Sequence, residues 1–209
     1  MRARSILILH EYQTARTHLG ADVVEVASIL HSRSIDFAYA HIVCDSEPET
    51  IDAGRVFASD PIDRDVFRRS QPLASYDVDA YAGLIICDHK ESLARLGSDA
   101  AFHDFVRALI ASDRPIVAVG GVAGALAHVR GRDDRSIIAN RRVTFTTSDD
   151  IERAVVDAGA IVKNEAPGDE HVSVDAYLIT AQNVRSAVTA TRTILAFIDP
   201  ASQARKRAS

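Results

Sequence analysis

The chain has 209 residues, of which 47% are hydrophobic and 25% charged, and its formal net charge is −5 at pH 7. This length and composition predict one globular domain with room for a full hydrophobic core. The acidic balance gives no reason to expect nucleic acid as a partner. The chain has no apolar run of about 18 residues, so no membrane span is predicted. The two cysteines, Cys44 and Cys87, are too few for a disulfide framework, which favours a reducing compartment and a cytoplasmic protein.

Short apolar runs predict parallel strands that are buried on both faces. These runs are SILIL (5–9), FAYAHIVC (37–44), GLIIC (83–87) and PIVAVG (115–120). Near the C-terminus, shorter strands are predicted at AIVKN (160–164), HVSV (171–174) and AYLIT (176–180), with a hairpin turn at 175–176. The segment 45–80 is rich in Asp, Pro and Ser, and we expect it to be a surface excursion with one short strand near 55–58.

Apolar residues between these strands recur at helical spacing. Helices are predicted over 23–30, 99–111, 149–156 and 183–197. Ser148 is the expected N-cap of the third helix, and Gly159 is expected to end it. The alternation of strands and helices predicts one α/β domain over residues 1–200, with a doubly wound, mostly parallel sheet, helices on both faces and a small β-hairpin extension near the C-terminus. Residues 201–209 are expected to form a basic, disordered tail.

In open α/β sheets, ligands bind beyond the carboxyl ends of the strands, so the polar residues that follow each apolar run are candidates for a pocket. One of these places is IVAVGGVAGAL (116–126), which predicts a strand, a tight turn and the start of a helix, with no Ser, Cys or Thr in the turn. The candidate pocket residues are His10, Glu11, Glu25, Cys87, Asp88, His89, Gly120 and Gly121.

Four motifs resemble the ThiJ/PfpI superfamily, relatives of the class I glutamine amidotransferases. They are GADVVEV (20–26), YAGLIICDH (81–89), RPIVAVGGV (114–122) and VSVDAYLITAQN (172–183). The motifs are spread from residue 20 to residue 183, and the resemblance extends over nearly the whole chain. The resemblance implies a flavodoxin-like fold, a homodimer, and a pocket glutamate at Glu25 in the first helix.

The chain departs from the family's pattern at its active site. Gly120 stands where the family has its nucleophilic cysteine, and Gly121 replaces the next residue, which is often histidine. Cys87, Asp88 and His89 replace the family's Pro-Gly-Gly. A nucleophile elbow needs a strained backbone, which glycine adopts without a steric clash because it has no Cβ. The turn therefore keeps its expected shape and loses its thiol, so the usual cysteine-dependent activity is predicted to be absent.

Three functions stay open on these residues. The leading hypothesis is a divergent, non-catalytic protein of this superfamily that binds a small molecule or acts in stress. The alternative is a hydrolase, amidase or aldehyde-processing lyase that uses Cys87, with His89 as its base, or a pocket carboxylate such as Glu25. The third is a partner-binding scaffold that uses the dimer surface.

We expect no cofactor and no metal. The set His10, Glu11, Glu25, Asp88 and His89 contains histidine and carboxylate ligands, but its spacing matches no known metal motif. The favoured explanation of the same residues is that they are polar loop residues in contact with water.

Overall fold

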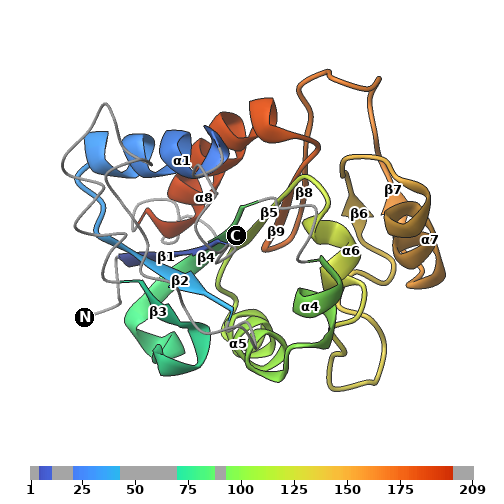
Figure 1. The fold of residues 1–209 in the computed structure, drawn as a ribbon, viewed down its shortest axis with the longest axis horizontal. Coiled ribbons are helices and arrows are strands. Elements are labelled where there is room, and N and C mark those ends of the chain that lie inside the picture. The colour runs from blue at the N-terminus through green and yellow to red at the C-terminus, as the bar shows by residue number, and fades with distance from the viewer. Residues whose placement is uncertain (1–4, 11–20, 43–69, 88–92, 200–209) are drawn as a thin grey trace, which may run out of the picture.

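The chain forms a seven-stranded sheet between two layers of helices, as seen in a computed structural model that describes residues 5–10, 21–42, 70–87 and 93–199 (Figure 1). In spatial order the strands are β3 (Gln71–Pro72), β2 (Phe37–His41), β1 (Ser5–His10), β4 (Tyr81–Ile86), β5 (Ile116–Val119), β9 (Leu178–Ala181) and β8 (Val172–Asp175). All neighbours are parallel except β8 and β9, which form an antiparallel hairpin. The predicted fold class and the C-terminal hairpin are confirmed.

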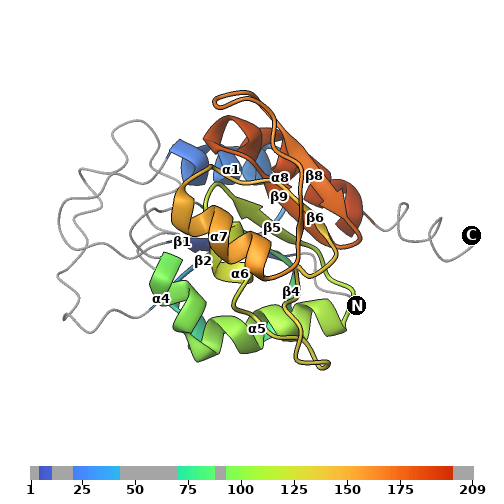
Figure 2. The same ribbon diagram turned by 90° about the vertical axis from the view of Figure 1, so that its right-hand side faces the viewer.

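The helices cover both faces of this sheet (Figures 1 and 2). Helices α1 (Ala21–Ser32) and α8 (Ala187–Ile198) pack against each other on one face. The other side carries α4 (Leu93–Ser98), α5 (Ala100–Ala111), α6 (Val122–Leu126) and α7 (Asp149–Asp157). Two buried apolar clusters correspond to the two faces, one around Val26 and Ile194 and one around Phe102 and Leu126. The sheet is therefore buried on both faces, which explains why its strands are continuously apolar.

Some elements differ from the sequence-based predictions. The predicted strand at 160–164 is β7 (Ile161–Val162), which pairs in parallel with β6 (Arg142–Val143) in a separate two-stranded sheet. The hairpin turn lies one residue later than predicted, at residues 176–177, and Ala176 has a φ of +53° there. The last helix is preceded by a 3₁₀ turn, η3 (Val184–Ser186).

Two predicted segments lie outside the described residues, namely the strand near 55–58 and the tail at 201–209. The described end of the irregular segment contains β3 and the 3₁₀ turns η1 (Leu73–Ser75) and η2 (Val78–Ala80). Within the described ranges, no helix is long and apolar enough to cross a membrane.

Helix ends follow local sequence signals. The side chain of Asp99 accepts a hydrogen bond from the backbone N–H of Phe102 at 2.7 Å, so Asp99 is the N-cap of α5. Ser148 is the N-cap residue of α7 by position, but its hydroxyl makes no capping hydrogen bond. Gly159 follows α7 with a φ of +78°, as expected for a glycine that ends a helix.

The strand order locates the ligand-binding edge of the sheet. The chain leaves β1 toward β2 on one side and continues with β4 on the other, so the order reverses between β1 and β4. Beyond the carboxyl ends of two such strands lies the crevice in which open α/β sheets bind ligands. His10 ends β1 and Cys87 follows β4. The two strand ends are joined because the Cys87 N–H donates to the carbonyl of Leu9 at 3.0 Å.

Candidate functional site

The turn between β5 and α6 has the geometry of an elbow. Gly120 has a φ of +64°, in the left-handed region that favours glycine, and Gly121 is the N-cap residue of α6 with a φ of −74°. The Gly120 N–H donates to the carbonyl of Ala181 at 2.8 Å, and its carbonyl accepts from the Thr146 N–H at 3.3 Å. The predicted strand, tight turn and helix are confirmed, and the turn is held by neighbours on both of its sides.

The other predicted site residues fall into three groups. His10 and Cys87 are buried, with 2% and 3% of their surface exposed, at the ends of two adjacent strands. Glu25 lies on α1, and its side chain is exposed to solvent. The three remaining candidates, Glu11, Asp88 and His89, lie outside the described residues.

The sheet therefore brings part of the predicted site together. Because β1, β4 and β5 are adjacent and parallel, His10, Cys87 and Gly120 lie along one edge. Glu25 belongs to the helix layer on one face, whereas α6, whose N-cap residue is Gly121, belongs to the other. That all eight candidates line one pocket stays a prediction.

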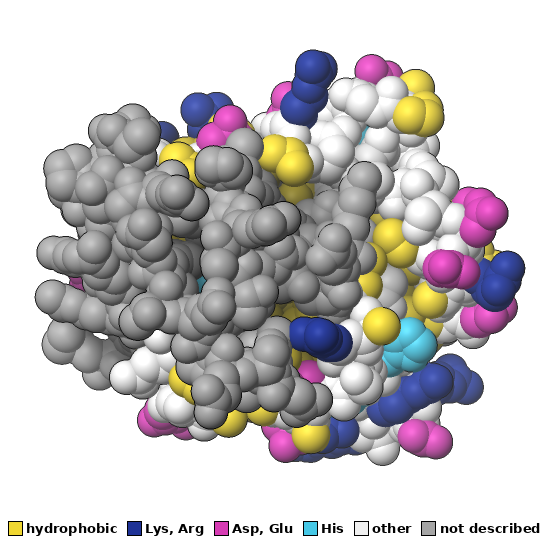
Figure 3. Space-filling model, viewed as in Figure 1, with side chains coloured by type: hydrophobic (Ala, Val, Ile, Leu, Met, Phe, Trp, Pro, Cys, Tyr) yellow, Lys and Arg dark blue, Asp and Glu magenta, His cyan; other side chains and the backbone are white. Residues whose placement is uncertain are grey.

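A cavity of about 530 Å³ opens beside the elbow, between α4, α6 and α7. Its wall combines apolar side chains with hydroxyl groups, one histidine and one carboxylate, and Figure 3 shows hydrophobic side chains and a histidine over this part of the molecule. The lining residues are Leu93, Ala94, Gly121, Gly124, His128, Thr146, Thr147, Ser148, Asp150, Ile151 and Ala154. Such a mixture suits a small ligand with an apolar body and a polar group that forms hydrogen bonds. We call this space the elbow cavity.

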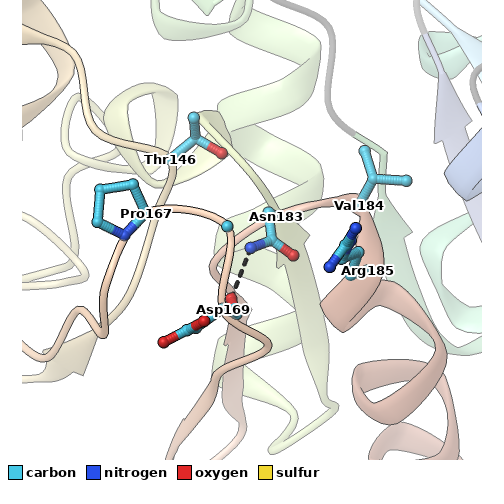
Figure 4. Close-up of a pocket in the computed structure, with 7 residues that line it drawn as sticks. Thr146, Pro167, Asp169, Asn183, Val184 and Arg185 are labelled. Carbon is cyan, nitrogen blue, oxygen red and sulfur yellow. Dashed lines mark hydrogen bonds between the residues drawn. The ribbon is translucent and has the colours of Figure 1, made fainter.

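A second cavity, of about 570 Å³, shares Thr146 with the first, and Figure 4 shows the residues that line it. It is lined by Thr146, Pro167, Gly168, Asp169, Asn183, Val184 and Arg185. The Asn183 side-chain N–H donates to the carbonyl of Asp169 at 2.6 Å, which fixes this loop against the start of η3. Thr146, whose N–H donates to the Gly120 carbonyl, lines both cavities.

Gln182 holds the segment 144–146 in place. The sequence-based prediction did not include this role. Its side-chain oxygen accepts from the Glu165 N–H at 2.7 Å and from the Thr144 hydroxyl at 3.1 Å. Its side-chain nitrogen donates to the carbonyls of Glu165 and Ala166 at 3.2 and 3.1 Å. Its backbone carbonyl accepts from the Thr146 hydroxyl at 2.7 Å. Gln182 lies within the VSVDAYLITAQN motif, which was the available signal.

The described residues show no metal centre. Within 5–10, 21–42, 70–87 and 93–199, no three His, Cys, Asp or Glu side chains are grouped so that they could hold an ion. The proposed donor set includes Glu11, Asp88 and His89 from outside these ranges, so that hypothesis stays open.

We expect Cys87 to react slowly with thiol reagents in the native protein. Its side chain is 3% exposed and packs among the apolar residues of the α1 and α8 face. A buried thiol reacts only after local opening, so alkylation by iodoacetamide at neutral pH should be roughly 100-fold slower than in denaturant. Mass spectrometry of the separate peptides distinguishes Cys87 from Cys44. Fast native alkylation of Cys87 would instead support the enzyme alternative.

The fold defines a structural class of protein. The mostly parallel sheet and its helices form the flavodoxin-like α/β fold of the DJ-1/ThiJ/PfpI proteins, to which many similar solved structures belong. No family model matches the sequence, and no curated protein matches it.

Three similar structures illustrate the likeness. The Rapid Encystment Protein of 24 kDa from Francisella tularensis is 17% identical over 95% of this chain and 100% of that one, with a TM-score of 0.75. Glyoxalase III from Candida albicans is 12% identical over 92% and 96%, with a TM-score of 0.74. A ThiJ/PfpI domain protein from Brachyspira murdochii is 13% identical over 93% and 96%, with a TM-score of 0.67. At these identities, the likeness establishes the fold alone.

Proposed function

We propose that this chain is a divergent member of the ThiJ/PfpI superfamily that binds a small molecule beside its elbow and performs no cysteine-dependent chemistry there. The observation that carries this proposal is the conformation of Gly120. Its φ of +64° gives the sharp turn that displays a nucleophile in elbow enzymes, but glycine has no side chain to display. The cavity next to the turn offers space for a ligand, and Gly120 provides no nucleophile that could attack it.

The wall of the elbow cavity indicates the kind of ligand. Leu93, Ile151 and Ala154 provide apolar contact. The hydroxyls of Thr146, Thr147 and Ser148 provide hydrogen bonds. The carboxylate of Asp150 disfavours an anion at this place. We therefore propose a small neutral carbonyl compound, such as an aldehyde or an amide, rather than a carboxylate.

A ligand screen tests this proposal. Small aldehydes, amides and carboxylates are added one at a time, and the melting temperature Tm is measured. At about 100 times its Kd a ligand stabilises the folded state by about 2.7 kcal/mol, which for a chain of this size raises Tm by about 5 to 10 °C. We expect Ala154→Leu, which fills the elbow cavity, to abolish the shift.

The matched control is Ala108→Leu, the same substitution in a separate hollow on α5. It should leave the shift unchanged. Glu25→Ala tests whether the pocket glutamate implied by the resemblance contacts the ligand. If no compound raises Tm, or if Ala154→Leu leaves the shift intact, ligand binding at the elbow is wrong and the scaffold hypothesis is favoured.

The homodimer rests on the resemblance and the cytoplasmic location on the small number of cysteines, and both stay predictions. The enzyme alternative that acts through Cys87 is not favoured, because the side chain of that residue is buried.

A further inference from the structure

Strand β2 lies on the side of β1 away from the elbow (Figure 1). Three polar side chains meet at the ends of β1 and β2. His10 is the last residue of β1, His41 is the last residue of β2, and Ser70 directly precedes β3. The two strands are parallel with His10 opposite His41, so both imidazoles lie on the same face of the sheet. Their ring centroids are 6.4 Å apart. We call these three residues the Ser70 cluster.

The hydroxyl of Ser70 lies between the two imidazoles. Its Oγ is 3.0 Å from Nδ1 of His41 and 3.2 Å from Nε2 of His10. A hydroxyl has one proton, so it donates to only one of these nitrogens. The other nitrogen carries a proton and donates it to Oγ. One imidazole is therefore a hydrogen-bond acceptor for Ser70, and the other is a donor.

His41 suits the acceptor role better. It makes the shorter of the two contacts, and it is only half-buried, whereas His10 is 2% exposed and stacks edge to face with Tyr39. Burial lowers the pKa of His41 below its usual value of 6.5, so its ring is neutral at pH 7 and has one unprotonated nitrogen. With Nδ1 of His41 as acceptor, Nε2 of His10 is the donor.

This is the arrangement of a serine beside a general base. We propose that Ser70 is a nucleophile toward small carboxylic esters, with His41 as its base and His10 as the donor that holds its oxygen in place. Ser70 is only partly buried, as a group that meets a substrate must be. This activity is independent of ligand binding at the elbow, because the cluster lies at β1 to β3 and the elbow cavity lies between α4, α6 and α7.

The reaction balances without a cofactor. Oγ of Ser70 forms a bond to the acyl carbon, its proton passes to Nδ1 of His41, and the ester's alcohol leaves with that proton. The acyl group then stays on Ser70. Water attacks this acyl-serine while His41 takes its proton, and the carboxylic acid leaves as Oγ regains a proton from His41.

The competing explanation is structural, because the same two hydrogen bonds would tie β1, β2 and the start of β3 together. The two explanations differ only in whether the basicity of His41 matters. His41→Asn separates them, since an asparagine oxygen can accept in place of Nδ1 but cannot take up the proton. His10→Gln is the complementary variant, because a glutamine nitrogen can donate in place of Nε2.

The experiment treats the full chain with a fluorophosphonate probe at pH 7 and locates the adduct by mass spectrometry. We expect one adduct, on Ser70, that is absent in Ser70→Ala. The labelling rate should fall by about 100-fold or more in His41→Asn, the usual contribution of a general base. In His10→Gln the labelling rate should stay within about tenfold of the rate of the unchanged chain. Ser112→Ala, which removes an exposed hydroxyl bonded to the Ala108 carbonyl, should change nothing.

Ser70→Cys covers the case in which another variant fails to fold. A thiol beside an imidazole is activated, so iodoacetamide should alkylate Cys at this position at least about tenfold faster than Cys87. The proposal is overturned if the probe labels other residues and not Ser70, if His41→Asn is labelled as fast as the unchanged chain, or if the introduced thiol reacts no faster than Cys87.

Discussion

Replacing Gln182 by alanine is expected to lower the free energy of unfolding by about 3 kcal/mol. The side chain of Gln182 is 4% exposed and makes four hydrogen bonds to Thr144, Glu165 and Ala166. Alanine removes all of them and leaves the partners unsatisfied, of which the Thr144 hydroxyl is buried and the groups of Glu165 and Ala166 are partly buried. The cost is about 1 to 3 kcal/mol for each group that water does not reach. Water that enters the gap compensates part of this loss. The expected loss of about 3 kcal/mol is therefore well below the sum of the costs of the four separate hydrogen bonds.

Two further variants show whether the hydrogen bonds are the cause. Gln182→Met keeps a side chain of similar length but cannot bond, so it should lose nearly as much stability as alanine. Thr193→Ala removes an exposed hydroxyl bonded to the Thr189 carbonyl and should change the free energy of unfolding by less than about 0.5 kcal/mol. Urea denaturation measures all three. If Gln182→Ala loses less than about 1 kcal/mol, another contact anchors the loop at 163–166.

The same substitution also links stability to the elbow. The backbone carbonyl of Gln182 holds the Thr146 hydroxyl, and Thr146 lines both cavities and contacts Gly120. When the side chain of Gln182 no longer fixes the loop at 163–166, the second cavity loses its support on one side. The arrangement around the elbow therefore depends on a residue that lies outside the turn itself.

The main sheet was predictable because its signals are local. Strands buried on both faces are continuously apolar, so β1, β2, β4 and β5 were identified within a few residues of their bounds. The elbow was predictable for the same reason, since a strand, two glycines and a helix follow one another in 116–126. Several short elements were not found. Helix α4 has six residues and contains Gly97, too few for a helical period, and β6 has two residues.

The polar contacts of the site could not be predicted because they join distant parts of the chain. Ser70 is 60 residues from His10 and 29 from His41, and Gln182 is 38 residues from Thr144. Spacing along the sequence carries no information about such pairs, and only the register of parallel strands brings them together. The position of Cys87 after a strand favoured a buried, inert thiol but did not exclude a reactive one, and the structure shows that Cys87 is buried.

Replacing Gly120 by alanine is expected to lower the free energy of unfolding by about 1 to 2 kcal/mol. Its φ of +64° is in the left-handed region, where a Cβ approaches the following carbonyl oxygen. The turn cannot relax freely, because its N–H is bonded to the Ala181 carbonyl and its own carbonyl to the Thr146 N–H. Urea denaturation measures the loss.

Gly159→Ala is the matched control, since Gly159 has a φ of +78° and an added Cβ there meets nothing within 4 Å. It therefore reports backbone strain alone, and any larger loss at Gly120 comes from crowding around the elbow. If Gly120→Ala is as stable as the unchanged chain, the turn does not hold its left-handed conformation and the elbow assignment is wrong. If the loss is found, any side chain at this turn, a nucleophile included, strains the fold by a similar amount. Glycine then keeps the sharp turn at lower strain than any other residue would, and this is the conformational feature on which the proposed ligand binding beside the turn depends.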